Sequence, residues 1–320
     1  MRIRTLKTDL ILLLCACIWG FSFVAQRIGM AYIGPFTYNA LRFALGSVSL
    51  LPLLLAGRRY QTMYGEILPP VTRRTTLLGG ALAGLALFAG SSLQQLGIVY
   101  TTAGKAGFIT GLYVVLVPMV GLLWRQLPGL GTWLGAVLAV IGLYLLSITE
   151  DLRISMGDVL VVVSAFFWAG HVHLIGYYSS RVGSIRLAFL QFAVCSILSL
   201  VTALLLETTS LPAIRLASGA ILFGGFFSVG VAFTLQAVAQ RDARPAHAAI
   251  IMSLETVFAA LGGWLMLHET LPVRGIVGCG VMLAGMLASQ LHVQFRAAPE
   301  DQRDRHTKRS TSDANAATPE

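Results

Sequence analysis

Apolar residues along the chain fall into ten runs, separated by short connections that carry turn-forming residues. The runs lie at about 9–28, 35–56, 77–100, 104–124, 131–148, 157–177, 186–206, 217–238, 246–266 and 274–292. Glycine and proline mark the connections, as in Gly34-Pro35 and Pro128-Gly129. A helix needs roughly 20 apolar residues to cross the hydrocarbon core of a bilayer. The pattern therefore predicts an all-α integral membrane protein with ten transmembrane helices.

The apolar pattern repeats itself. An offset of 149 residues places Trp19 on Trp168, and further along an offset of 143 places Gly142 on Gly285. Each half, 1–150 and 157–292, holds five of the runs, and because five is odd the second half enters the membrane from the opposite side. Such an inverted-topology repeat is typical of secondary transporters, with the substrate site between the halves near the midplane. A duplicated helix bundle without transport is the alternative.

Composition agrees with this class, since 56% of the 320 residues are hydrophobic and only 12% are charged. Of the 23 Lys and Arg residues, 17 fall in the terminal segments and in every second connection, and 5 fall in the other connections. Because Lys and Arg gather on the cytoplasmic side, both termini are predicted to be cytoplasmic. The net charge of +9 has the same origin and does not indicate nucleic-acid binding. The polar tail, 293–320, is predicted to be disordered.

Motifs for catalysis or for a bound cofactor are absent from the sequence. It has no Walker-type phosphate loop, no H-E-x-x-H and no G-x-S-x-G. Cys15 and Cys17 point to different faces of a helix, as do His171 and His173, so neither pair is a good set of metal ligands. We therefore expect no catalytic residue, cofactor or metal, and transport driven by a gradient or by exchange. A non-transporting scaffold or receptor-like protein and a lipid-acting membrane enzyme are the alternatives.

Four stretches resemble the EamA family of the drug/metabolite transporter superfamily. They read CIWGFSFVAQR, PFTYNALRF, LGIVYTTAGKAGFITGLYVVLVP and SLETVFAALGGWLMLHETL, within a resemblance that covers 9–292. The family implies a ten-helix permease with a central cavity, which often exports amino acids or other small metabolites, here across a bacterial inner (plasma) membrane. Small four-helix relatives exchange protons on a glutamate in the first span. This first span has only Asp9 at its edge, so that mechanism does not carry over.

Aromatic and polar residues in the spans are the candidates for lining the cavity. Trp19, Phe23 and Gln26 share one face of the first helix, and Trp168 and His171 share one face of the sixth. Two indoles facing each other could stack on a flat or amphipathic substrate, whereas packing between helices is the alternative reading. Further hydrogen-bonding groups come from three residues of the third and fourth spans, Gln94, Gln95 and Tyr113.

Charged residues within or near the spans are the candidates for coupling or gating. Glu255 lies near the middle of the ninth run, where it could pair with Arg42 or Lys105, or carry the proton that couples transport. Asn39 precedes Arg42 by one turn. Lys105 falls in the first turn of the fourth run and points either to the interface or to the mouth of the cavity. The expected partners are a small-molecule substrate, membrane lipid and a coupling proton, for a monomer or a homodimer.

Overall fold

The structure is a computed structural model that describes residues 2–56, 72–100, 103–123, 125, 127–147, 155–268, 273–285 and 287–288. The described residues form helices and no strand. The helices are α1 (Arg2–Met30), α2 (Pro35–Leu55), α4 (Arg73–Tyr100), α5 (Ala103–Gly111), α6 (Tyr113–Leu123), α7 (Leu130–Ser147), α8 (Met156–Val182), α9 (Ser184–Leu206), α10 (Leu211–Leu216), α11 (Ser218–Leu222), the π-helix η1 (Phe223–Phe233), α12 (Thr234–Ala239), α13 (Pro245–Met252), α14 (Glu255–Leu267) and a last helix, Val273–Gly285.

Seven helical segments in the described part are long and apolar enough to cross a membrane. They are Leu6–Met30, Pro35–Leu55, Arg73–Tyr100, Met156–Val182, Ser184–Leu206, Ser218–Ala239 and Pro245–Leu267. Three shorter apolar helices, Ile109–Leu123, Leu130–Gly142 and Val273–Gly285, lie at the remaining three expected places. The expectation of an all-α membrane protein is thus confirmed, whereas the number of ten spanning helices stays a prediction.

Two of the expected continuous helices are interrupted. The run expected at 104–124 breaks at Leu112, between α5 and α6, and the run expected at 246–266 breaks at Ser253 and Leu254, between α13 and α14. In the second break the hydroxyl of Ser253 donates to the carbonyl of Ile250 at 2.8 Å. Hydroxyl groups that bond to the nearby backbone in this way compete with the regular helical ladder. Hydropathy alone does not reveal such breaks.

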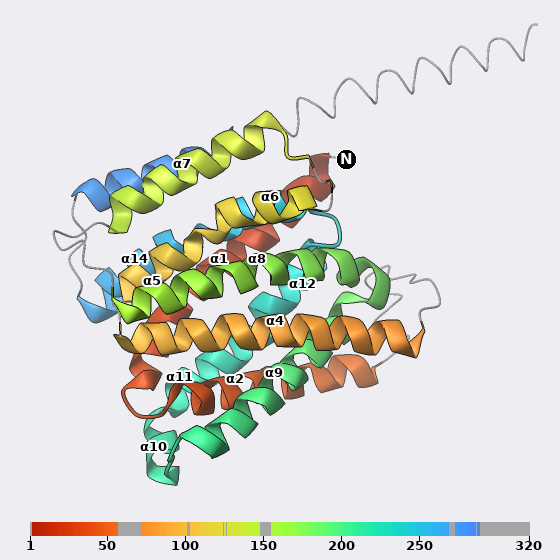
Figure 1. The fold of residues 1–320 in the computed structure, drawn as a ribbon, viewed down its shortest axis with the longest axis vertical. Coiled ribbons are helices and arrows are strands. Elements are labelled where there is room, and N and C mark those ends of the chain that lie inside the picture. The colour runs from red at the N-terminus through yellow and green to blue at the C-terminus, as the bar shows by residue number, and fades with distance from the viewer. Residues whose placement is uncertain are drawn as a thin grey trace, which may run out of the picture.

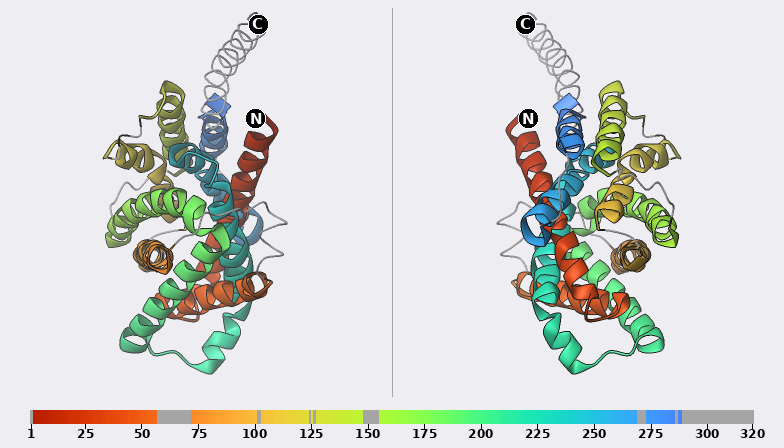
Figure 2. Two further views of the ribbon diagram at one scale, coloured as in Figure 1. Left: turned by 90° about the vertical axis from the view of Figure 1, so that its right-hand side faces the viewer. Right: turned by 90° about the vertical axis from the view of Figure 1, so that its left-hand side faces the viewer.

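The two ends of the long axis of the molecule hold different helices (Figures 1 and 2). α7 and Val273–Gly285 lie at one end, α2 and α9 lie at the other, and α1, α4, α8 and the broken helices lie between them. α1 and α8 run in opposite directions across this middle layer (Figure 1). The ring cluster of Phe43, Phe192 and Phe233 holds α2, α9 and η1 together.

Small residues allow the helices to approach closely. A Cβ atom on Gly142 would lie 2.5 Å from the carbonyl oxygen of Gly278, and one on Gly285 would lie 2.9 Å from that of Gly135. These two contacts are reciprocal, because the offset of 143 that places Gly142 on Gly285 also places Gly135 on Gly278. Close backbone contact at small residues is a common way for helices to associate in membranes. α7 therefore packs against Val273–Gly285 through matching positions of the two halves.

Candidate functional site

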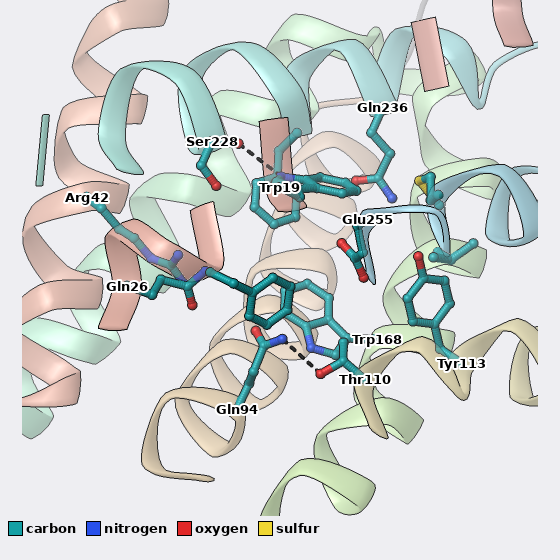
Figure 3. Close-up of a pocket in the computed structure, with 14 residues that line it drawn as sticks. Trp19, Gln26, Arg42, Gln94, Thr110, Tyr113, Trp168, Ser228, Gln236 and Glu255 are labelled. Atoms are coloured by element: carbon teal, nitrogen blue, oxygen red, sulfur yellow. Dashed lines mark hydrogen bonds between the residues drawn. The ribbon is translucent and has the colours of Figure 1, made fainter. Parts of the chain in front are cut away.

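A cavity lies in the middle layer, where helices of both halves meet. Its walls are built from α1, α2, α4, α5, α6, α8, η1, α12, α13 and α14. The 14 lining residues are Trp19, Phe23, Gln26, Arg42, Gln94, Thr110, Tyr113, Trp168, Val172, Ser228, Phe233, Gln236, Met252 and Glu255 (Figure 3).

Eight of the residues expected at the site line this cavity. Six come from the expected substrate and hydrogen-bonding group and two from the expected coupling or gating group: Trp19, Phe23, Gln26, Gln94, Tyr113 and Trp168, and Arg42 and Glu255. Gln95, His171 and Asn39 are not among the lining residues. The side chain of Lys105 lies outside the described part of the structure, although its backbone belongs to α5.

An aromatic wall contains one ring that the sequence did not suggest. Phe233 packs against both indoles, with ring centroids 4.6 Å from Trp19 and 6.0 Å from Trp168. The planes of Phe233 and Trp168 differ by 16°, so these two rings are stacked. The two tryptophans were expected to face each other across a substrate. Here a phenyl ring of the protein contacts both of them, stacked on Trp168 and tilted by 53° against Trp19.

Hydrogen bonds fix part of the cavity wall and leave other groups without a partner. Trp19 Nε1 donates to the carbonyl oxygen of Ser228 at 3.2 Å, and Gln94 Nε2 donates to Thr110 Oγ1 at 3.0 Å (Figure 3). Three polar atoms of lining residues are buried and have no partner among the described residues: Gln26 Oε1, Gln236 Oε1 and Trp168 Nε1. Unsatisfied buried polar groups are costly, so a ligand or water that bonds to them gains affinity.

The two charged residues of the cavity lie apart. Arg42 lies beside Gln26 on one side, and Glu255 lies near Tyr113 on the other, with Trp19 between them (Figure 3). Arg42 Nε donates to Asn39 Oδ1 at 2.9 Å, and its guanidinium carbon lies 4.9 Å from the centre of the Phe43 ring. In the described structure Arg42 and Glu255 form no ion pair, so Arg42 is not the partner of Glu255. Glu255 interacts instead with Tyr113.

Three expected residues act next to the cavity rather than in it. His171 Nε2 lies 2.8 Å from Gln191 Oε1, and the ring of His171 meets Trp168 edge to face at 5.9 Å. Asn39 orients Arg42 through the bond just described. Gln95 points away from the cavity and donates to Met30 Sδ at 3.6 Å. Its neighbour Gln94 lines the cavity instead, because consecutive residues of a helix point about 100° apart.

Sequence reasoning missed several lining residues that the repeat could have indicated. The offset of 149 that relates Trp19 to Trp168 also relates Phe23 to Val172. An offset of 142 relates Gln94 to Gln236, Thr110 to Met252 and Tyr113 to Glu255. Ten of the 14 lining residues therefore form five pairs, each with one member in either half. Ser228 and Phe233 have no counterpart in the cavity, and no local sequence signal marks them.

A helical membrane bundle with a buried, mixed polar and aromatic cavity between its halves has the architecture of a membrane transporter. A family model described as the EamA-like transporter family matches the chain twice, over residues 6–148 and 155–289. The chain belongs to this family and is a membrane transporter. The expected resemblance is thereby confirmed.

Similar proteins carry matching descriptions. An uncharacterized transporter of Archaeoglobus fulgidus is 32% identical over 91% of this chain and 88% of its own length. The uncharacterized inner membrane transporter YedA of Escherichia coli K12 is 28% identical over 83% of this chain and 85% of its own length. A solved crystal structure superposes with a TM-score of 0.74 at 16% identity, over 90% of this chain and 98% of that chain, which supports the fold.

Proposed function

We propose that the chain is a secondary transporter of a bacterial inner membrane that exports small metabolites such as amino acids through the cavity. The observation that carries this proposal is the placement of one cation and one acid, Arg42 and Glu255, on either side of an aromatic cavity without an ion pair between them. An amino acid presents a carboxylate and an ammonium group at one end of a side chain. Arg42 is suited to the carboxylate and Glu255 to the ammonium, with Trp19, Trp168 and Phe233 around the side chain. The direction of export rests on the family resemblance.

The orientation in the membrane belongs to the same proposal. Ten spans as two inverted repeats of five, with both termini cytoplasmic, are supported by three observations. α1 and α8 run in opposite directions, matching glycines make reciprocal contacts, and the cavity is lined by five pairs of matching residues. The excess of Lys and Arg on the terminal side supports the assignment of that side to the cytoplasm. An inner-membrane location is what the name of YedA states for that protein.

Glu255 is the proposed carrier of the coupling proton. It is 6% exposed, lines the cavity and interacts with Tyr113, so it can reach a substrate bound there. A carboxyl group that releases its proton when an ammonium group binds beside it exchanges one cation for another. In proteoliposomes, transport by the wild type should then depend on an imposed pH gradient and transport by Glu255→Gln should not. An unchanged response to the gradient in Glu255→Gln would remove Glu255 from the coupling role.

The transport proposal is tested with purified protein in proteoliposomes and a panel of labelled amino acids. Each amino acid is paired with its decarboxylated amine and its N-acetylated form. We expect flux of the amino acid only, with Arg42→Gln losing the preference over the amine and Glu255→Gln losing the preference over the N-acetylated form. Arg74→Gln is the matched control, because Arg74 is an exposed arginine at the start of α4. Absence of flux for the whole panel would overturn amino acids as the substrate class.

A further inference from the structure

The cation and the acid of the cavity stand at opposite ends of it. Figure 3 shows Arg42 beside Gln26 at one end and Glu255 at the other. Helix α1 measures the separation, because Gln26 follows Gly20 by six residues and a Cβ atom on Gly20 would lie 2.6 Å from the carbonyl oxygen of Glu255. At a rise of about 1.5 Å per residue, the two ends are roughly 9 Å apart along α1.

The end at Glu255 presents hydrogen-bond acceptors. Gln236 lies close to Glu255 in Figure 3, and its Oε1 is buried without a partner among the described residues. The hydroxyl of Tyr113 interacts with Glu255 on the other side. An ammonium group carries three donors and no acceptor, so a carboxylate with a neighbouring amide oxygen and hydroxyl oxygen is a complementary set of partners. This end of the cavity therefore suits an ammonium group.

The end at Arg42 presents a cation together with one acceptor. Arg42 Nε donates to Asn39 Oδ1, which leaves the outer nitrogens of the guanidinium for a carboxylate. Gln26 Nε2 donates to Ser22 Oγ at 3.3 Å, whereas Gln26 Oε1 is buried and has no partner within the described part of the chain. A carboxylate with a hydrogen-bond donor on the adjacent carbon matches this pair. The α-carboxylate and α-ammonium groups of an amino acid have that arrangement.

The stretch between the two ends is apolar. Its lining side chains are Trp19, Phe23, Trp168, Val172, Phe233 and Met252. Methylene groups gain free energy when they leave water for such surroundings. The carboxyl carbon and the nitrogen on the α-carbon are only two bonds apart, each about 1.5 Å long, so they can occupy one end of the cavity but not both. A ligand that meets Arg42 and Glu255 together needs an ammonium group at the far end of a methylene chain.

We propose that the substrate is an amino acid whose side chain is a methylene chain ending in an ammonium group, as in lysine. Its α-carboxylate binds Arg42 and its α-ammonium binds Gln26 Oε1. The methylene chain follows the apolar stretch, and the terminal ammonium binds Glu255 and Gln236 Oε1. This inference rests on the proposed transport function and narrows its substrate class. An uncharged side chain would leave the buried carboxylate of Glu255 without a cation, and an acidic one would place a like charge beside it.

Three acids with the same carbon chain test this class. Lysine carries both ammonium groups, 6-aminohexanoate carries only the terminal one, and norleucine carries only the one on the α-carbon. Their affinities for the purified protein are measured by isothermal titration calorimetry, and their fluxes in proteoliposomes. Norleucine should bind roughly 10- to 100-fold more weakly than lysine, because it lacks the charge-assisted bond to Glu255. The loss for 6-aminohexanoate should be roughly 2- to 10-fold, as for one bond to the neutral acceptor Gln26 Oε1.

Two variants assign the two ammonium groups to their partners. Glu255→Gln should bring the affinity for lysine close to that for norleucine, while the affinity for norleucine stays unchanged. Gln26→Met, a change that preserves the length of the side chain, should bring the affinity for lysine close to that for 6-aminohexanoate. Arg74→Gln, an exposed change at the start of α4, should keep all three affinities.

The outcomes separate this substrate class from the transport function. Norleucine that binds as tightly as lysine to the wild type, or a Glu255→Gln protein that still prefers lysine over norleucine, overturns the proposal. Flux of other amino acids with no preference for lysine keeps the transport function and removes this class. Binding in the expected order without flux of any acid keeps the ligand class and removes the transport function.

Discussion

Trp19 and Trp168 occupy matching places in α1 and α8, yet their indole nitrogens are bonded differently. Trp19 Nε1 donates to the carbonyl of Ser228, which lies in the π-helix η1, and Trp168 Nε1 has no partner within the described residues. The position that matches Ser228 is Ala86, which lies in α4, an unbroken α-helix. π-Helical geometry shifts the backbone ladder, and such segments are frequent at functional sites. The nitrogen of the first indole is therefore bonded within the protein, whereas the nitrogen of the second is not.

The charged residues differ between the halves in the same way. Arg42 corresponds to Gln191, and Glu255 corresponds to Tyr113, so the cation comes from the first half and the acid from the second. Gln191 is turned to His171 and does not line the cavity. The matching positions build both sides of the cavity, and the departures from the match place its one cation and one acid among the lining residues. At a position where the two halves differ, a substitution to the residue of the other half is therefore the most direct test of the comparison.

The largest effect is expected for Arg42→Gln, which replaces the arginine by the residue type found at the corresponding position of the second half, Gln191. Loss of charge-assisted hydrogen bonds to a carboxylate costs about 1.5–3 kcal/mol, or roughly 10- to 100-fold in affinity. We expect that loss in the apparent affinity for amino acids, measured by concentration-dependent uptake into proteoliposomes, with membrane abundance preserved. Arg74→Gln should keep the wild-type affinity. An Arg42→Gln transporter with unchanged affinity would show that the arginine serves packing against Tyr38 and Phe43 and not the substrate.

The next effect concerns helix packing. It is expected at a position where the first half has a glycine and the second half has an alanine. Gly20 in α1 corresponds to Ala169 in α8. A Cβ atom on Gly20 would lie 2.3 Å from Phe258 Cβ and 2.6 Å from the carbonyl oxygen of Glu255, so α14 must move if it is added. Overpacking of this kind costs about 1–3 kcal/mol. We expect Gly20→Ala to lower the midpoint of thermal unfolding in detergent.

The matched control for Gly20→Ala is Ala169→Gly, which removes a methyl group at the corresponding place in α8. A glycine within a helix costs about 0.5–1 kcal/mol relative to alanine. The midpoint should therefore fall less in Ala169→Gly than in Gly20→Ala. The reverse order would mean that the α1–α14 contact can widen freely, and that the packing of α14 beside the cavity tolerates an added methyl group.

Much of this molecule could be predicted from the sequence, because hydropathy and spacing encode it. Membrane burial fixes the apolar runs, and every one of the ten runs contains a helix in the described part. The helical period placed Trp19, Phe23 and Gln26 on one face, and all three line the cavity. The other expected residues that line it were chosen mainly because they are aromatic, polar or charged within apolar runs. Whether they bind substrate stays a prediction.

The remaining features depend on information that a hydropathy pattern does not contain. Phe233 reaches the two indoles from η1, and nothing in FGGFFSVGVAF distinguishes a π-helix from an α-helix. The choice between Gln94 and Gln95 depends on the rotation of α4 against its neighbours, which one residue changes by about 100°. The breaks at Leu112 and at Ser253 lie inside runs whose hydropathy predicts one continuous span. Tertiary contacts decide all three.

A smaller effect is expected for the two indole nitrogens, and it separates their roles. Trp168→Phe removes an unpartnered donor, so a substrate that uses it should lose about 0.5–1.5 kcal/mol, or roughly 2- to 10-fold in affinity, while stability stays near that of the wild type. Trp19→Phe removes the donor to Ser228 and should lower the unfolding midpoint with little change in affinity. Uptake kinetics and thermal unfolding of both variants decide the matter. Equal changes in both variants would show that the two indoles serve the same purpose.

The smallest effect is expected for Gln95, which does not line the cavity and differs from its counterpart in the second half, Ala237. Gln94 and Gln236 match and both line the cavity, whereas the adjacent Gln95 matches Ala237 and turns away from it. Gln95→Ala gives the first half the residue of the second and removes a buried acceptor that has no partner among the described residues. Its unfolding midpoint and its transport should both stay near wild type.

Gln94→Ala, the same change one position earlier, breaks a matched pair and the bond to Thr110. Uptake should therefore fall about 2- to 10-fold, as for one neutral hydrogen bond. A loss of transport in Gln95→Ala with none in Gln94→Ala would place the cavity on the other face of α4, and the pairing of the two halves across it would fail.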